Sequence, residues 1–218
     1  MRKMFPWTIL LLLAALLAPA AADPLTDLIG GIQARYGKAK DLTVDFVQTT
    51  VVKQLGNREK RADGVIYLAR PDKMRWVYKT APAKEIITDG TSLVILYVEE
   101  KKAYLSKSQG GYNIALPMSI LSGEVDVKTQ YTPELLPDEG GKARLKLTPK
   151  KPLGFNYLVL HINRQGFLVE RIDTVDAYGN LNKIELKNPR FNTGLSTGLF
   201  SYAPKPGIEI IDAPMMDL

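Results

Sequence analysis

The 218-residue sequence contains no cysteine and a single histidine, His161. Without cysteine the chain has no disulfide bonds and no thiol nucleophile, and the Cys/His ligand sets that usually hold zinc are excluded. A Ser-His-Asp triad would have to use His161, yet the sequence has no Gly-x-Ser-x-Gly elbow. The histidine lies in the apolar run 158–162, a setting that favours a structural role. We therefore expect no enzyme: no catalytic residue, no metal site and no cofactor.

Other signals of catalysis are also weak. No phosphate-binding loop or dinucleotide fingerprint is present. Two of the three acidic residues Glu170, Asp173 and Asp176 could form a catalytic carboxylate pair. A solvent-exposed strand face explains their positions better. The formal net charge is +6, and the sequence has no dense basic stripe, so a nucleic-acid partner is not expected.

Long apolar runs are limited to the N-terminus. Arg2 and Lys3 precede an apolar stretch at 7–17, and small residues follow at 20–22, which is typical of a cleaved secretory signal peptide, residues 1–22. The stretch is shorter than the ~20 residues that a membrane-spanning helix needs, so an uncleaved anchor is the weaker alternative. We expect residues 23–218 to form a single domain, which is large enough for a substantial core.

Hydrophobic periodicity predicts one helix followed by many strands. Leu25, Leu28, Ile29 and Ile32 recur at helical spacing within residues 23–36, which Asp23 or Thr26 could cap. A second, short apolar helix is predicted at 116–122. Strands are predicted at 42–49, 62–70, 74–79, 84–89, 92–98, 102–107, 125–131, 143–148, 156–163, 167–175 and 181–187, with an edge strand at 208–211.

Turn residues separate these strands at short intervals. Hairpin turns are predicted at 89–90, 163–166 and 176–180, and a loop at 137–141. The pattern predicts a mainly β (α+β) fold: one long antiparallel meander of about ten strands. A sheet of that many twisted strands tends to curl, and the helices are the natural cover for its concave face.

The strands within residues 64–97 are apolar on both faces, whereas a half-exposed antiparallel strand is polar on one side. Such a sheet must be covered on both faces or line a cavity. Alternation places Ile66, Leu68 and Arg70 on one face, which we interpret as the inner face. A guanidinium there needs acceptors, which carbonyls at the C-terminal end of a covering helix would supply. Alternation alone leaves open whether Arg70 simply reaches solvent.

A series of short motifs runs through the chain. They are Leu42-x-x-x-Phe46-x-Gln48, Gly64-x-Ile66, Arg70-Pro71, Arg75-Trp76-x-Tyr78, Asp89-Gly90, Leu147-Thr148-Pro149-Lys150, Asp176-x-x-Gly179-Asn180, Phe200 and Pro206-Gly207-Ile208. Each is weak alone, but their order and spacing resemble the LolA family of periplasmic carriers for outer-membrane lipoproteins. The resemblance covers essentially all of residues 23–218.

The resemblance implies an unclosed β-barrel with short helices as a lid over a hydrophobic cavity. It also implies a monomeric periplasmic chaperone. Such a protein accepts acylated lipoproteins from an inner-membrane ABC-type releasing complex, shields their acyl chains, and delivers them to an outer-membrane lipoprotein receptor. If the resemblance holds, one face of the strands within residues 64–97 packs the core and the other lines the cavity.

The resemblance also assigns residues to roles. Arg70 stands at the position that holds the lid closed through hydrogen bonds to the lid backbone, whereas Met74 replaces a phenylalanine of some members. The predicted cavity residues are Leu42, Val44, Phe46, Ile66, Leu68, Met74 and Trp76. The predicted lid residues are Leu25, Leu28, Ile32, Leu116, Met118, Ile120 and Leu121.

Three alternatives stay open. The outer-membrane receptor has a related fold but carries a lipid anchor, and the missing cysteine argues against it. A LolA-like carrier or sensor of another lipid is the second. A periplasmic hydrolase on a β scaffold is the third.

Overall fold

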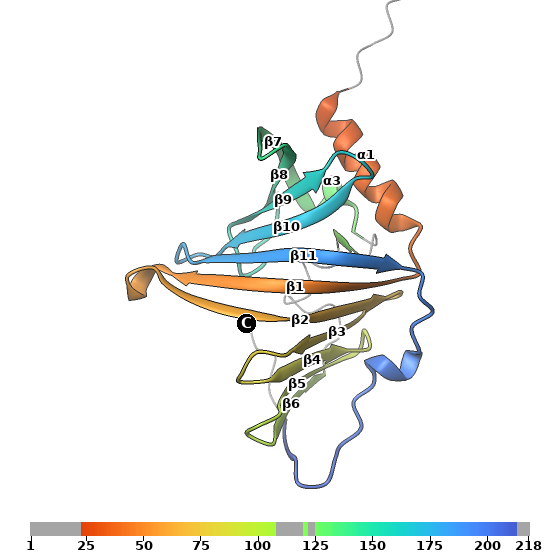
Figure 1. Ribbon diagram of the computed structural model, residues 1–218, viewed down its shortest axis with the longest axis vertical. Helices are drawn as coiled ribbons and strands as arrows, with labels where there is room; N and C mark the ends of the chain where they lie inside the picture. Colours follow the sequence, from red (N-terminus) through yellow and green to blue (C-terminus); the bar gives the residue numbers. More distant parts are fainter. Residues whose placement is uncertain (1–22, 108–119, 122–124, 213–218) are drawn as a thin grey trace, which may run out of the picture.

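The computed structural model describes residues 23–107, 120–121 and 125–212, and its described strands form one twelve-stranded sheet (Figure 1). The strands are β1 (Asp41–Val52), β2 (Arg58–Ala69), β3 (Lys73–Tyr78), β4 (Lys84–Thr88), β5 (Ser92–Tyr97), β6 (Lys102–Lys107), β7 (Tyr131–Glu139), β8 (Lys142–Pro149), β9 (Tyr157–Asn163), β10 (Leu168–Val175), β11 (Leu181–Phe191) and β12 (Glu209–Asp212). The helical elements are α1 (Pro24–Gly37), α3 (Val127–Gln130) and the 3-10 turns η1 (Lys53–Leu55) and η3 (Thr197–Phe200).

Two antiparallel meanders make up the sheet. Strands β1 to β6 are neighbours in sequence and in space, and so are β7 to β11. The meanders join where β1 pairs with β11, which places Phe46 opposite Leu186. The short strand β12 pairs with β6 in parallel. The two ends of the strand order, β7 and β12, are not paired with each other, so the described sheet is unclosed.

The predicted mainly β, unclosed fold is thus confirmed, but the prediction of one continuous meander is wrong. The pairing of β1 with β11 joins strands from opposite ends of the sequence. Local alternation carries no information on such a pairing, because both strands would look the same in either arrangement.

Two boundary predictions are also wrong. The segment predicted as a strand at 125–131 contains α3, because Asp126 accepts hydrogen bonds from two backbone N–H groups of the first turn and caps it. No strand is predicted over 132–139, where the structure has most of β7, and the predicted loop at 137–141 is shorter because β7 continues to Glu139. Of the predicted helix at 116–122, only residues 120–121 are described, and these are helical. The predicted signal peptide lies outside the described residues.

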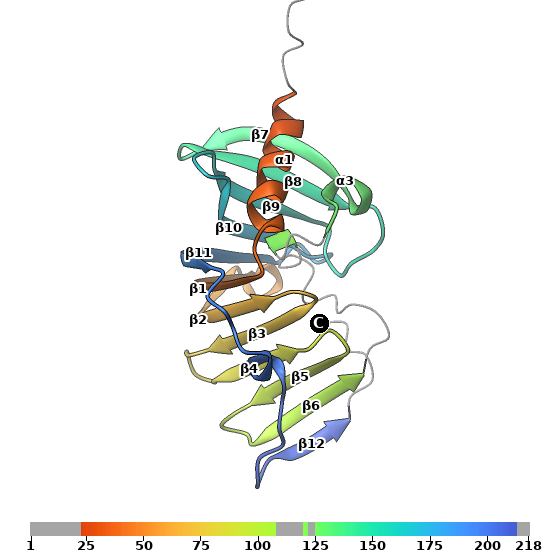
Figure 2. The same ribbon diagram turned by 90° about the vertical axis from the view of Figure 1, so that its right-hand side faces the viewer.

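Helix α1 confirms the predicted N-terminal helix. The Asp23 carboxylate accepts hydrogen bonds from the N–H groups of Leu25 and Thr26, and Pro24 occupies the first turn, where a missing N–H costs nothing. The helix lies against the β7–β10 side of the sheet (Figure 2). Its buried side chains are Leu28, Ile29, Ile32 and Tyr36. We call the sheet face that packs with these side chains the inner face and the opposite one the outer face.

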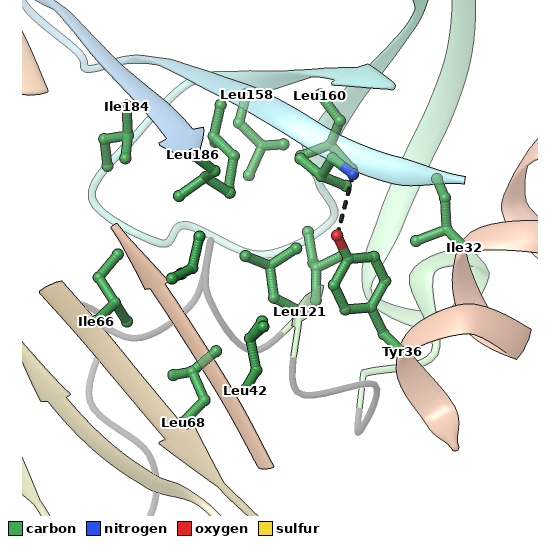
Figure 3. Packing of buried hydrophobic residues seen from close by; sticks show 14 of the residues in the cluster. Ile32, Tyr36, Leu42, Ile66, Leu68, Leu121, Leu158, Leu160, Ile184 and Leu186 are labelled. Carbon is green, nitrogen blue, oxygen red and sulfur yellow. Dashed lines mark hydrogen bonds between the residues drawn. The ribbon is translucent and has the colours of Figure 1, made fainter. Parts of the chain in front are cut away.

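Two contacts fix α1 to the hairpin between β9 and β10. A Cβ atom at Gly31 would lie 2.3 Å from the Phe167 ring, so only glycine lets the ring pack against the helix. The Tyr36 hydroxyl accepts a hydrogen bond of 3.0 Å from the Val169 N–H, drawn as the dashed line in Figure 3. Burial raises the pKa of Tyr36 to about 12, so the hydroxyl stays neutral.

The chain between β11 and β12, residues 192–208, covers part of the outer face; we call it the C-terminal segment. It passes over β3 to β5 and then reaches the edge strand β12 (Figure 2). Tyr202 and Ile208 pack against a small outer-face cluster. The buried members of that cluster are Ile87, Val94, Leu96 and Ala103.

Candidate functional site

The predicted cavity residues form rows across the first three strands of the inner face. The rows are Leu42–Leu68–Met74 and Val44–Ile66–Trp76, with Phe46 in the next row. Each member is at most 5% exposed, and all belong to one apolar cluster with α1 and residues 120–121. Figure 3 shows Leu121 between the strands of the two meanders, close to Leu42 and Tyr36. In this conformation the rows are a packed core.

Glycine at position 64 shapes this core. A Cβ there would lie 1.9 Å from the Val77 carbonyl oxygen and 2.8 Å from the Phe46 ring. The absence of a side chain therefore lets Phe46 lie over β2 and reach the aromatic residues of β3. Its ring centroid is 5.1 Å from that of Trp76 and 5.0 Å from that of Tyr78.

The two-sided apolar pattern follows from cover on both faces. The predicted cavity rows share their face with the core, whereas the outer face of β4 to β6 is covered by the C-terminal segment. The expectation that one face packs the core while the other lines the cavity stays a prediction, because the inner face holds most of the core and also borders a pocket at Trp76, Ile86 and Ile95. The apolar outer-face residues indicate that a cover exists, but the pattern of the strands does not show which distant segment supplies it.

The main pocket lies at the other end of β1 from α1, between the two meanders, and has a volume of about 460 Å³. Of the seven predicted cavity residues only Trp76 lines it. One wall is apolar and aromatic and comes from β3 to β5 and from the loop before β9. This wall is formed by Trp76, Tyr78, Ile86, Ile95, Tyr97, Leu153 and Phe155.

The facing wall comes from β1, β10 and β11 and is partly polar. Its amides are paired with each other: Gln48 Nε2 donates to Asn182 Oδ1 over 2.8 Å, and the Thr50 hydroxyl donates to the same oxygen over 3.3 Å. The Thr174 hydroxyl is buried and has no hydrogen-bond partner among the described residues. Asp176 also lines the pocket, but its carboxylate accepts the N–H groups of its own turn.

One cation faces the pocket. Lys84 Nζ lies 4.5 Å from the centre of the Tyr78 ring, a cation–π contact. Burial lowers the pKa of Lys84 and raises that of Tyr78. No carboxylate of the described chain forms an ion pair with Lys84.

Arg70 lies at the opposite end, where β2 ends. Its N–H donates to the Lys40 carbonyl over 3.1 Å, and its half-buried side chain borders a void of about 10 Å³ together with Leu121. The structure therefore brings the predicted latch next to one predicted lid residue. Of the other predicted lid residues, Leu28, Ile32 and Ile120 are buried in the core, Leu25 packs at its margin, and Leu116 and Met118 lie outside the described residues.

Two polar residues that sequence reasoning missed hold the C-terminal segment. The buried Asp41 carboxylate accepts hydrogen bonds from the N–H groups of Thr193 and Gly194 at 2.7 and 2.9 Å. Burial opposes ionisation, but the hydrogen bonds outweigh it and lower the pKa of Asp41. Arg75 donates to the Leu199 carbonyl over 2.8 Å. Only the outer-facing position of Arg75 in its strand signals such a role.

The predicted Asp89–Gly90 turn is confirmed between β4 and β5. Gly90 has a φ of 95°, and the Asp89 carboxylate accepts the N–H groups of Thr91 and Ser92. Burial acts against ionisation, but these hydrogen bonds lower the pKa of Asp89 to about 2. A Cβ on Gly90 would lie 3.1 Å from Asp72, so this turn packs against the turn after Arg70.

His161 lies on the outer face, away from the pocket. Its Nε2 is 2.9 Å from the Asp173 carboxylate and 2.8 Å from Arg171. Burial lowers the pKa of His161, although Asp173 acts in the other direction. Asp173 is only 15% exposed and Glu170 pairs with Lys142, so the expected solvated acidic face is partly an ion-pair network.

Residues 23–107, 120–121 and 125–212 lack two kinds of feature. No group of three or more His, Cys, Asp or Glu side chains there is arranged to hold a metal ion. No helix in that part of the chain is long and apolar enough to cross a membrane.

An open, twisted sheet with a helix on its inner face and a pocket between its meanders gives this chain the architecture of an unclosed β-barrel. The chain belongs to the LolA family: residues 37–203 match the family described as "Outer membrane lipoprotein carrier protein LolA".

Similar proteins extend over most of the chain. An outer-membrane lipoprotein carrier protein of Chromobacterium violaceum is 28% identical over 211 residues, covering 97% of this chain and 98% of its own. One of Methylococcus capsulatus is 29% identical over 175 residues, covering 80% and 82%. The crystal structure of an uncharacterised conserved protein from Thermus thermophilus has the same fold. Its TM-score is 0.55 at 11% identity, with 86% of this chain and 98% of that chain covered.

Proposed function

We propose that this protein is a periplasmic carrier of acylated lipoproteins. It is exported by a cleaved signal peptide, residues 1–22, and residues 23–218 act as one domain. It takes lipoproteins from an inner-membrane ABC-type releasing complex, shields their acyl chains and delivers them to an outer-membrane receptor. Membership of the LolA family and the names of its relatives support this function.

The observation that carries the proposal is the continuity between the open pocket and the apolar inner face. Trp76 belongs to both: it lines the pocket and it stands in the row with Ile66 and Val44. An acyl chain that enters the pocket therefore meets the packed inner face next, and the two together offer a contiguous apolar surface between the meanders.

The size of the pocket implies that the carrier opens when it loads. Three acyl chains contain about forty methylene groups, which need on the order of 1,200 Å³ at roughly 30 Å³ each, the share of one liquid water molecule. The pocket of about 460 Å³ holds a part of this cargo. The remainder needs the space that α1 and residues 120–121 now fill.

The energies allow this opening. Exposing the four buried α1 side chains costs about 1.5–3 kcal/mol each, on the order of 10 kcal/mol together. Burying forty methylene groups returns about 30 kcal/mol at ~0.8 kcal/mol each. The cargo can therefore displace the helix without ATP at the carrier, whereas the empty protein stays closed.

Arg70 is proposed as the latch of this closed state. It borders the same small void as Leu121, and it stands where the second strand meets the start of the first. Loss of the guanidinium would change the balance between closed and open conformations and leave the β-sheet intact.

The experiment is the release of lipoproteins from spheroplasts by the purified chain that begins at Asp23. We expect an acylated lipoprotein to appear in the supernatant in complex with the chain. The release of a cargo without acyl groups should not depend on the chain. An Arg70→Leu variant should keep the fold and transfer cargo poorly to outer membranes, with Arg58→Leu on the exposed start of β2 as the control.

Three outcomes would contradict the proposal. Absence of release would favour a carrier or sensor of another lipid. Normal delivery by Arg70→Leu would remove the latch role. Turnover of an ester or glycan that disappears in a His161→Ala variant would favour the hydrolase.

A further inference from the structure

In the closed conformation of the protein, the pocket has about the volume of a single acyl chain. At roughly 30 Å³ per methylene group, about 460 Å³ holds about fifteen such groups. Because α1 and the 120–121 segment are packed on the inner face, this capacity exists without any opening of the protein. A lipid with one chain can therefore bind the conformation that excludes a lipid with three.

The walls of the pocket are suited to such a chain. Trp76, Tyr78, Ile86 and Ile95 form a continuous apolar wall on adjacent strands β3 to β5. The amide groups of the facing wall are occupied with one another, since Gln48 and Thr50 both donate to Asn182. They impose little desolvation cost on a chain that slides past them.

The charge at the pocket selects the head group. Lys84 contacts the Tyr78 ring, and no carboxylate of the described chain pairs with it. Asp176, the acidic residue of the lining, already accepts the N–H groups of its turn. A half-buried ammonium group without a counter-ion gains most from an anionic ligand that arrives with its own apolar surface.

We propose that the closed protein binds one amphiphile with a single acyl chain and an anionic head group, the chain lying against Trp76 and the head group beside Lys84. Carboxylate and phosphate head groups share this chemistry, so a fatty acid and a lysophospholipid are both candidates. Such binding goes beyond lipoprotein carriage, because it belongs to the conformation that is too small for a lipoprotein's three chains.

Trp76 makes the test direct, because it is the only tryptophan in residues 23–218. The chain that begins at Asp23 is titrated with dibromostearate below its critical micelle concentration, and bromine on the chain quenches an indole that it touches. We expect quenching that saturates at one fatty acid per protein. Palmitate and palmitoyl lysophosphatidic acid are then tested as competitors of the brominated chain, and their relative affinities show whether the site prefers a fatty acid or a lysophospholipid. Monopalmitoyl glycerol serves as the uncharged competitor.

The variants separate charge from fold. Lys84→Met should weaken binding of palmitate about tenfold and leave binding of monopalmitoyl glycerol within about twofold. Lys84→Arg should restore most of the affinity for palmitate. Lys40→Met, at the opposite end of β1, removes an exposed lysine and should leave the affinity for both ligands unchanged.

Three results would overturn the inference: no quenching, saturation at three chains per protein, or equal losses for charged and uncharged ligands in Lys84→Met. The lipoprotein release assay is independent of this titration. A protein that releases lipoproteins and is not quenched refutes the single-chain site alone, whereas one that is quenched and releases nothing refutes the carrier alone.

Discussion

Two adjacent glycines in α1 should respond in opposite ways to the same substitution. A Cβ at Gly30 meets no atom within 4 Å, whereas one at Gly31 would lie 2.3 Å from the Phe167 ring. Alanine gains about 1 kcal/mol over glycine in a helix, so Gly30→Ala should raise the free energy of unfolding by about that amount. In Gly31→Ala the gain is offset by roughly 1–3 kcal/mol of overpacking, because Phe167 has to leave its place on the helix.

Urea denaturation of the chain that begins at Asp23, followed by circular dichroism, measures the difference. We expect the free energy of unfolding of Gly30→Ala to exceed that of Gly31→Ala by about 1–3 kcal/mol. For a chain of this size, each kcal/mol corresponds to a difference of roughly 2–4 °C in Tm. If α1 opens as proposed, this contact opposes the opening, so Gly31→Ala should load lipoprotein faster than Gly30→Ala. Equal stabilisation by both alanines would refute the packing of α1 on Phe167.

Three further contacts give predictions of their own. Tyr36→Phe leaves a buried N–H of β10 without its acceptor and should lower the free energy of unfolding by about 1–3 kcal/mol in a urea titration. Tyr178→Phe, on a side chain that is 73% exposed, should have no effect. An equal response of the two variants would contradict the role of the Tyr36 hydroxyl. The pKa of Asp41 is lowered in the folded chain, so its contribution is present above about pH 4 and is lost as the pH falls through the folded pKa. The stability difference between wild type and Asp41→Asn should therefore shrink as the pH is lowered from 7 to below 3.8, and a constant difference would show that the charge of this carboxylate does not hold the segment. Arg75→Met removes a hydrogen bond to the C-terminal segment and should speed its limited proteolysis at pH 7; an unchanged cleavage rate would show that this hydrogen bond does not hold the segment.

Local patterns predicted the elements of this fold well, because one face of nearly every strand is buried. The period of two along β3 follows from side chains that point alternately to the core and away from it. The helical period of α1 arises in the same way from its buried face. The error at 125–131 has a local cause: Val125 and Val127 alternate with polar residues, but the Asp126 side chain caps a helical turn.

What the sequence could not provide depends on contacts between distant segments. Strand β1 pairs with β11, and Ile87 and Leu96 are covered by the C-terminal segment. In both cases the partners lie about a hundred residues or more apart in the sequence, a separation that costs little extra loop-closure entropy. The predicted cavity residues lie on one inner face, yet whether such a face is hollow depends on α1 and residues 120–121. The pocket lysine, Lys84, was missed because an isolated lysine at the start of a strand has no distinctive pattern.

Native mass spectrometry of the protein, isolated gently from the cells that produce it, would reveal directly what the protein carries. We expect a complex whose extra mass is that of one acylated lipoprotein, together with free protein or protein with one single-chain anionic lipid. Arg70→Leu should change the share of the lipoprotein complex. A protein that never carries a lipoprotein, under conditions that preserve a bound lipid, would contradict the proposed function.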